Sequence, residues 1–177
     1  PTNTRIAAAR LLAEIRGQEA LGVLLPLAEK GDYQFRAGAL DAIAHCAGDG
    51  ITSALVGRLK ATAAPEVKTD LLLALAKRND AAARPDVIEA AKDADAGVRA
   101  AAITALLSLG RDEAIAPLVE LITSEGADAK LAAETLSRIP GDKPLAAAGA
   151  ALASANAKPK TALLELLAAR GAASQKE

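Results

Sequence analysis

A basic residue recurs along this 177-residue chain at almost constant spacing, and this repeat restricts the fold more than any other feature. Successive copies are 31, 32, 31, 31 and 30 positions apart, at Arg5, Arg36, Lys68, Arg99, Lys130 and Lys160. Each basic residue lies near the start of an Ala- and Leu-rich segment, which is followed by a break and a second apolar segment. A period in this range indicates an array of small units that stack on one another.

The composition indicates that these units are helical. Hydrophobic residues make up 51% of the chain, yet aromatic residues are only 1%, and both Met and Trp are absent. A core must therefore be built from Ala, Leu, Ile and Val. Because Ala and Leu have high helix propensity and the aromatic residues that favour strands are scarce, we expect an all-α fold.

The helix boundaries follow from apolar positions that recur three and four residues apart, as one face of a helix requires. Glycines are expected to end the first helices in a left-handed conformation, at Gly17, Gly48, Gly110, Gly141 and Gly171. Aspartates are expected to cap the first helices at Asp32 and Asp95, and the second helices at Asp49, Asp112 and Asp142. The second helices are predicted at residues 18–30, 50–62, 84–93, 113–124 and 144–154.

The chain is predicted to be a single domain of five helix pairs and one extra C-terminal helix. Neither helix of a pair has enough neighbours within the pair to cover its apolar face, so successive pairs must share a core. The copies are expected at residues 2–31, 32–63, 64–93, 94–125 and 126–155, with a half copy at 156–171. Because the sequence starts with Pro1 rather than Met, we expect a piece of a larger protein.

Residues Asp95 to Ile122, DAGVRAAAITALLSLGRDEAIAPLVELI, resemble the HEAT repeat in its short bacterial form, the phycobilisome-lyase type. The resemblance covers nearly the whole chain and is weaker in the third and fifth copies, where Ala64 and Gly126 replace the expected Asp. It implies a right-handed α-α superhelix, a HEAT-like solenoid, with the second helices on the concave side. It also implies a protein-binding scaffold, although some branches of the family bind nucleic acid or handle a chromophore.

The six basic residues have two interpretations. They could form a row of cations that binds phosphates or an acidic peptide, or they could make contacts that stabilise the fold. The structural interpretation is preferred, because Asp32 precedes Arg36 and Asp95 precedes Arg99 by one helical turn. Each pair is expected to form within its helix and to bridge to the neighbouring repeat.

Catalysis is not expected. His45 and Cys46 are adjacent, but neighbours on a helix point about 100° apart, so they cannot form a nucleophile and base pair. Aligned with Leu109 and Ser108, Cys46 is expected in the core and His45 on the surface. The carboxylates recur once per repeat, and no HExxH, CxxC, phosphate loop or serine elbow occurs. We therefore predict no enzyme activity, no metal and no cofactor.

The composition also argues against several kinds of partner. The net charge is -1, without runs of like charge, and Tyr33 and Phe35 are the only aromatic residues available to stack on bases. Nucleic-acid binding of the HEAT-like DNA glycosylase type and phycobilin-lyase-like chromophore handling are therefore less favoured. No apolar run reaches the roughly 18 residues of a membrane span. A single Cys excludes the disulfide-scaffold class and leaves the compartment open, with the cytoplasm slightly favoured.

The function predicted from these observations is a non-catalytic scaffold that binds a protein or peptide on its concave face. By alignment the binding strip consists of Pro26, Glu29, Lys60, Asp86, Glu89, Lys92, Glu120 and Thr123. Pro26 within a predicted second helix has two interpretations. Ordinary helix curvature is preferred over a kink at Pro26 that Gly22 would ease. The alternative function is a spacer or accessory module, which self-associates or docks through the leucines Leu163, Leu164, Leu166 and Leu167.

Overall fold

The computed structural model describes residues 1–124, 126–154, 161, 163–166 and 168. All the secondary structure that it describes is helical, as the composition predicts. The chain divides into two compact units, residues 1–105 and 106–177. The predicted single domain stays a prediction, and each unit is described by itself below.

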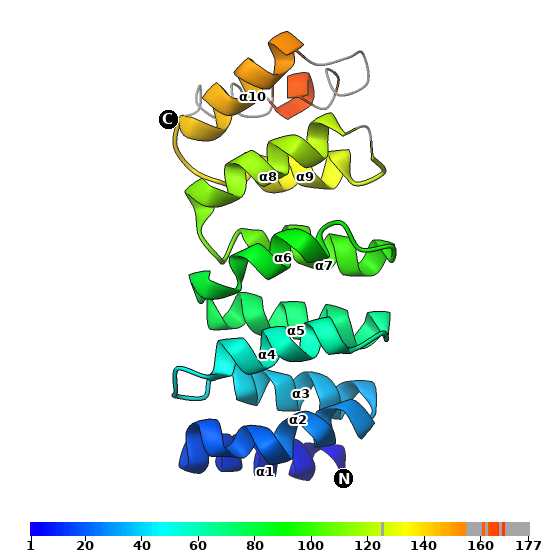
Figure 1. The fold of residues 1–177 in the computed structure, drawn as a ribbon, viewed down its shortest axis with the longest axis vertical. Helices are drawn as coiled ribbons and strands as arrows, with labels where there is room; N and C mark the ends of the chain where they lie inside the picture. The colour runs from blue at the N-terminus through cyan, green and yellow to red at the C-terminus, as the bar shows by residue number, and fades with distance from the viewer. Residues whose placement is uncertain (125, 155–160, 162, 167, 169–177) are drawn as a thin grey trace. The chain divides into compact units, whose positions relative to one another are not determined.

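The first unit contains seven α-helices and two 3₁₀ segments (Figure 1). The first helices of its copies are α1 (Thr2–Arg16), α3 (Tyr33–Ala44), α5 (Pro65–Arg78) and α7 (Ala96–Leu106). The second helices are α2 (Leu21–Lys30), α4 (Ile51–Ala61) and α6 (Arg84–Ala90). The 3₁₀ segment η1 (Gly17–Ala20) directly precedes α2, and η2 (Ala81–Ala83) directly precedes α6. Helix α3 packs against α1, α2 and α5, so that successive first helices form one layer and the second helices form another.

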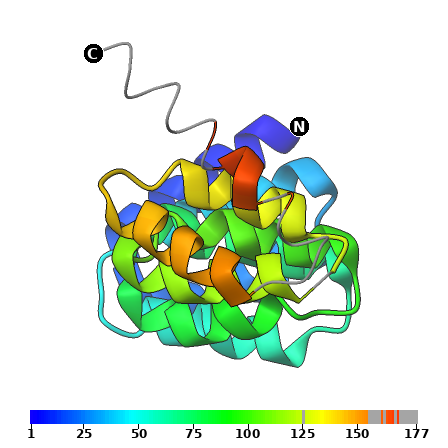
Figure 2. The same cartoon turned by 90° about the horizontal axis from the view of Figure 1, so that it is seen from above.

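The second unit contains α8 (Arg111–Thr123), α9 (Ala129–Ser137) and α10 (Lys143–Ser154). Helix α8 packs against both α9 and α10. Figure 2 shows α9 on one side of this unit and the second helices α8 and α10 on the other. Residues 163–166 are helical, at the place of the predicted eleventh helix, while Lys160 and Gly171 lie outside the described residues.

The predicted glycines have positive φ in the turns after the first helices, where the chain adopts a backbone that Cβ disfavours. Only Gly17 directly follows its helix, because α3, α7 and α9 each end four residues before their glycine. Positive φ angles occur at Gly17 (51°), Gly48 (131°), Gly110 (121°) and Gly141 (89°). The third copy has no glycine at this place, and Asn79 adopts the left-handed conformation instead, with φ 54°. Asparagine is one of the few other residues that tolerate it.

The aspartate caps are confirmed for the first helices and wrong for two of the second helices. The Asp32 carboxylate accepts a hydrogen bond from the Phe35 amide at 2.8 Å, and Asp95 accepts one from the Val98 amide at 3.0 Å. Helices α4 and α8 instead begin at Gly50 and Gly110, with no side-chain cap, so Asp49 and Asp112 do not have the predicted role. Gly110 directly precedes α8, which leaves Asp112 inside the first turn of that helix.

Pro26 lies inside α2, which continues through it to Lys30. The irregular part of the second helix of this copy is the 3₁₀ segment η1, which ends at the residue before α2. No atom outside the local helix lies within 4 Å of the position that a Cβ would take at Gly22, the residue four before the proline. The proline is therefore accommodated within an uninterrupted helix.

Candidate functional site

The predicted strip maps to the second helices and to the turn after α6. Helix α2 carries Pro26 and Glu29, α4 carries Lys60, and α6 carries Asp86 and Glu89, with Lys92 in the following turn. Glu120 and Thr123 lie on α8 of the second unit and are described separately. The exposed members are Pro26, Lys60, Glu89, Lys92 and Glu120, and the half-buried members are Glu29, Asp86 and Thr123.

Four of the predicted residues lie around one cavity of about 220 Å³ between α4 and α6. Lys60 and Asp86 face each other there, with their charged atoms 2.5 Å apart. The remaining lining residues, which the repeat alignment does not predict, are Leu59, Lys68, Ala90 and Asp93. Lys68 is the basic residue of the third copy, so the repeat does bring one member of that series to the predicted surface.

The charges of this cavity are largely neutralised by pairing. Lys68 Nζ lies 2.6 Å from Asp93 Oδ2, and the hydrogen bond from Lys68 lowers the pKa of the Asp93 carboxyl. The backbone amide of Asp95 donates a second hydrogen bond to Asp93, at 2.9 Å. Three lysines and three acids thus line a surface of mixed charge, which offers polar contacts of both signs without a field that would attract phosphate.

Several residues of the predicted strip connect neighbouring second helices. Glu29 pairs with Arg58 of α4, just as Lys60 of α4 pairs with Asp86 of α6. Glu29, Lys60 and Asp86, which the repeat alignment predicts to face a partner, are thus engaged within the chain, and Arg58 is a contact that the alignment does not predict. The available signal was the separation of each pair, 29 and 26 residues, which is close to the repeat period.

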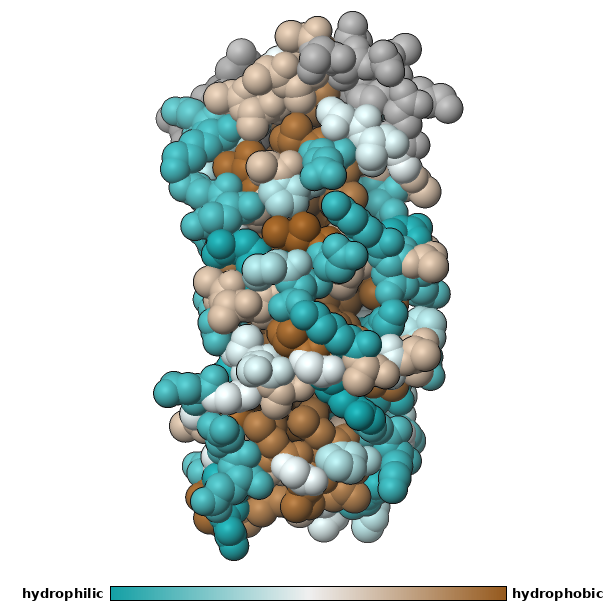
Figure 3. Space-filling view, in the orientation of Figure 1, coloured by the Kyte–Doolittle hydropathy of each residue, from teal (hydrophilic) through white to brown (hydrophobic). Residues whose placement is uncertain are grey.

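Exposed apolar side chains occur on α2 at positions that are not part of the predicted strip. Val23 is 52% exposed and Leu27 is 45% exposed, and residues four apart lie on the same side of a helix. Figure 3 shows hydrophobic surface at the level of α2 and more hydrophilic side chains at the level of α4 and α6. The exposed side of the second helices in the first unit therefore combines an apolar part and a charged part.

The recurring basic residues make structural contacts, but the predicted partner of Arg36 is wrong. Arg36 Nε lies 2.5 Å from Asp70 Oδ2 of the next first helix, and both side chains are buried. Asp32 is not this partner, because its carboxylate caps the Phe35 amide. Arg5 lies over the Phe35 ring, 4.1 Å from its centre, and Arg99 donates to the backbone oxygens of Asp93 and Ala94.

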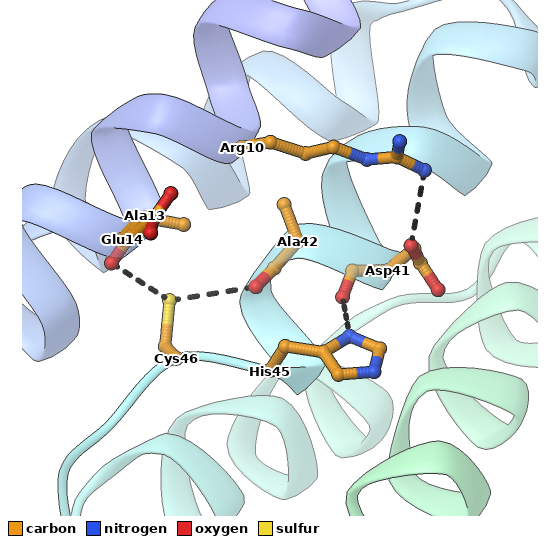
Figure 4. Close-up of a pocket in the computed structure, with 7 residues that line it drawn as sticks. All are labelled: Arg10, Ala13, Glu14, Asp41, Ala42, His45 and Cys46. Atoms are coloured by element: carbon orange, nitrogen blue, oxygen red, sulfur yellow. Dashed lines mark hydrogen bonds and ion pairs between the residues drawn. The ribbon is translucent and has the colours of Figure 1, made fainter.

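His45 and Cys46 line a cavity of about 290 Å³ between α1 and α3 (Figure 4). The prediction for both residues is confirmed, since Cys46 is buried and His45 is exposed. His45 Nδ1 lies 2.7 Å from the Asp41 backbone oxygen, whereas Cys46 Sγ lies 3.7 Å from the Ala13 oxygen. Burial raises the pKa of the Cys46 thiol, which disfavours the nucleophilic thiolate.

The described part of the chain holds no group of three or more His, Cys, Asp or Glu side chains arranged to bind a metal ion. Within the same residues, none of the helices has the length and hydropathy that crossing a bilayer requires. The C-terminal leucines form a smaller exposed surface than predicted, because Leu163 and Leu166 are buried while Leu164 is exposed. The Leu167 side chain lies outside the described residues.

The fold consists of helix pairs that repeat about every 31 residues, and a comparison with known protein families finds the same kind of repeat. Residues 52–138, from α4 to α9, match the family model described as HEAT repeats. This part of the chain consists of HEAT repeats. No curated protein matches the chain. HEAT repeats are commonly protein-interaction scaffolds and are generally non-catalytic. The all-α, HEAT-like solenoid predicted from the sequence is confirmed, while the phycobilisome-lyase sub-type stays a prediction.

Proposed function

We propose that the chain is a non-catalytic scaffold that binds a protein or peptide on the second-helix face, defined here as the exposed sides of α2, α4 and α6. The observation that carries this proposal is the cavity between α4 and α6, which collects four predicted strip residues. The exposed Val23 and Leu27 add an apolar part to the same layer of helices. Apolar anchors beside polar groups of both signs are typical of protein-binding surfaces.

Mixed charge favours a protein or peptide over nucleic acid. Phosphate binding requires an excess of free cations along the surface, and it weakens steeply as salt is added. At the cavity on this face, Lys60 of α4 and Lys68 of α5 are each paired with a carboxylate. A backbone of phosphates would have to displace Asp86 and Asp93 from these lysines.

The test is selection of binding peptides from a random display library, followed by affinity measurement on variants. Leu27→Asp and Glu89→Lys are expected to weaken the selected peptides at least tenfold, because one removes an apolar anchor and the other reverses a charge at the cavity. The matched control is Leu73→Asp on α5, since Leu73 and Leu27 are both 45% exposed but belong to different layers.

Two outcomes would contradict the proposal. Peptides that bind the Leu27→Asp and Glu89→Lys variants as tightly as the original chain would place binding elsewhere. Tight binding of labelled DNA or RNA that falls steeply between low and physiological salt would identify a nucleic-acid surface instead.

A further inference from the structure

Helix α4 carries two cations and is enclosed on both sides by other second helices. Its sequence contains Arg58 and Lys60 and no acidic residue. On one side Arg58 pairs with Glu29 of α2. On the other side Lys60 pairs with Asp86 of α6. Neighbours within the chain therefore occupy both sides of α4, and its outward side is the one that remains open to a partner.

In both of these pairs the cation lies nearer to solvent than the acid. The Arg58 side chain is 42% exposed, against 22% for Glu29. The Lys60 side chain is 66% exposed, against 21% for Asp86. Guanidinium and ammonium groups each have several donors, so one carboxylate does not use them all. Helix α4 can therefore donate hydrogen bonds outward while its two pairs stay intact.

The surface of α4 between the two cations is formed by small residues. Ser53, Gly57 and Ala61 are four positions apart, so they share one side of the helix, and all three are exposed. Gly57 lies between Arg58 and Lys60 around the helix axis, because successive residues are about 100° apart. No atom outside the local helix lies within 4 Å of the position that a Cβ would take at Gly57. A peptide main chain therefore has room to approach α4 between its cations.

Helix α6 presents the opposite charge. It contains one basic residue, Arg84, and two acidic residues, Asp86 and Glu89. Asp86 is half-buried and held by Lys60, whereas Glu89 is exposed. Lys60 and Glu89 both line the cavity of about 220 Å³ between α4 and α6. A partner that lies across this cavity therefore meets a cation on α4 and an acid on α6.

A peptide in the polyproline II conformation fits the spacing of stacked helices. The axes of packed helices lie about 8–10 Å apart. A polyproline II chain has about three residues per turn and rises about 3.1 Å per residue, so side chains on one side recur about every 9 Å. In a β-strand, side chains on one side recur about every 7 Å, which matches the helix spacing less well. Residues three positions apart in such a peptide therefore reach neighbouring second helices.

We propose that the second-helix face binds a peptide in the polyproline II conformation that carries an acidic and a basic residue three positions apart. The acidic side chain lies over α4 and accepts hydrogen bonds from Lys60, and the basic side chain pairs with Glu89 of α6. This inference rests on the proposed function, because it specifies the partner of the same face.

The first test varies the spacing of the two charges in the peptide. Each member of a synthetic library carries one Glu and one Lys, in either order, at separations from adjacent to six positions, with neutral residues elsewhere. Peptides retained by the immobilised chain should be enriched about fivefold at a separation of three relative to separations of two and four, since a correctly placed exposed ion pair has an effect of this size. Equal recovery of all separations would overturn the inference.

The second test exchanges the charges across each contact, using the tightest-binding peptide of that library. Lys60→Glu should weaken this peptide at least tenfold, and replacing the peptide's Glu by Lys should recover most of the loss. Glu89→Lys should likewise be rescued by a peptide in which Glu replaces the Lys. The matched control is Lys77→Glu on α5, because Lys77 and Lys60 each lie 2.5 Å from a carboxylate and are more than half exposed, in different layers. Circular dichroism verifies that each variant remains folded.

The outcomes separate this inference from the proposed function. Peptides that Leu27→Asp weakens, but that show no preferred spacing and no recovery on charge exchange, would overturn the inference and leave the proposed function standing. Failure to retain any peptide, or equal weakening by Lys77→Glu and Lys60→Glu, would contradict both.

Discussion

Arg36 and Lys130 occupy the same place in the repeat and have opposite environments. Arg36 of α3 is buried and pairs at 2.5 Å with Asp70, which belongs to another helix. Lys130 of α9 is 80% exposed, and its ion pair lies within its own helix, 4.0 Å from Glu134. An isolated contact of the second kind contributes little, whereas a buried pair cannot lose one member without leaving a charge in the core. A conserved spacing within one chain therefore does not imply one energetic role.

The largest expected effect is the loss of the buried pair. Asp70→Ala should lower the free energy of unfolding by about 3–5 kcal/mol, because the Arg36 guanidinium would remain buried without its carboxylate. Urea denaturation followed by circular dichroism measures the change. Glu134→Ala is the control in the other region and should cost less than about 0.5 kcal/mol. Equal losses in the two variants would remove the distinction between the two regions.

Arg78 is a third basic residue, and unlike Arg36 and Lys130 it makes contacts with the backbone of another helix pair. Its guanidinium donates to the carbonyl oxygens of Cys46 at 2.8 Å and Gly48 at 2.9 Å, in the turn after α3. Arg78→Ala should cost about 2–3 kcal/mol, since hydrogen bonds from charged groups contribute more than neutral ones. Arg78→Lys retains the charge without the planar donors and should recover less than half of the loss. Full recovery in thermal or urea unfolding would show that charge alone is responsible.

The Lys68 pair, which is only partly buried, predicts a smaller effect that depends on pH. The hydrogen bond from Lys68 lowers the pKa of Asp93 in the folded state, so this carboxylate stabilises the fold above the unfolded pKa of about 4. The stabilisation is lost as the pH falls through the lower folded pKa. Asp93→Asn should therefore be less stable at neutral pH, by about 1 kcal/mol, and should lose less stability between pH 5 and 3.

Parallel acid titrations of the original chain and Asp93→Asn, followed by circular dichroism, test this sign. The double variant Lys68→Met/Asp93→Asn is the control, because it contains neither charge of the pair. If Asp93→Asn loses as much stability on acidification as the original chain, the Lys68 contact does not hold the carboxylate ionised.

The smallest effect is expected at Lys130 itself. Lys130→Ala should change the free energy of unfolding by less than about 0.5 kcal/mol, because the side chain is exposed and its pair is long. A loss above 1 kcal/mol in urea denaturation would mean that Lys130 contributes to stability in the way that Arg36 does.

The local features of the fold were predictable because local rules decide them. The caps at Asp32 and Asp95 and the positive φ at Gly17 depend only on neighbours in the chain, and all of these predictions are confirmed. The burial of Cys46 was also predictable, since its repeat position is apolar in another copy. Helix α4 shows the limit of such rules, because the chain begins it at Gly50 without using Asp49 as a cap.

The candidate site was predictable in position and less so in its contacts. Alignment of the copies selected Lys60, Asp86, Glu89 and Lys92, and the structure brings these four to one cavity. It could not show that Lys60 pairs with Asp86, because a contact between helices depends on how they pack. The exposure of Val23 and Leu27 was missed for the same reason, since an apolar pattern does not tell which side a neighbouring helix covers.

The sequence by itself determined the helices, their order and the period of the array, because helix propensity, apolar spacing and glycine turns act over a few residues. Tertiary structure alone decided the partners of the recurring charges. Asp32 satisfies a backbone amide of its own helix, which leaves Arg36 to a carboxylate 34 residues away. The Arg36–Asp70 pair forms only when stacking brings separate helices together, and its burial makes the loss of one member costly. The exposed Lys130–Glu134 pair lies within one helix and contributes little.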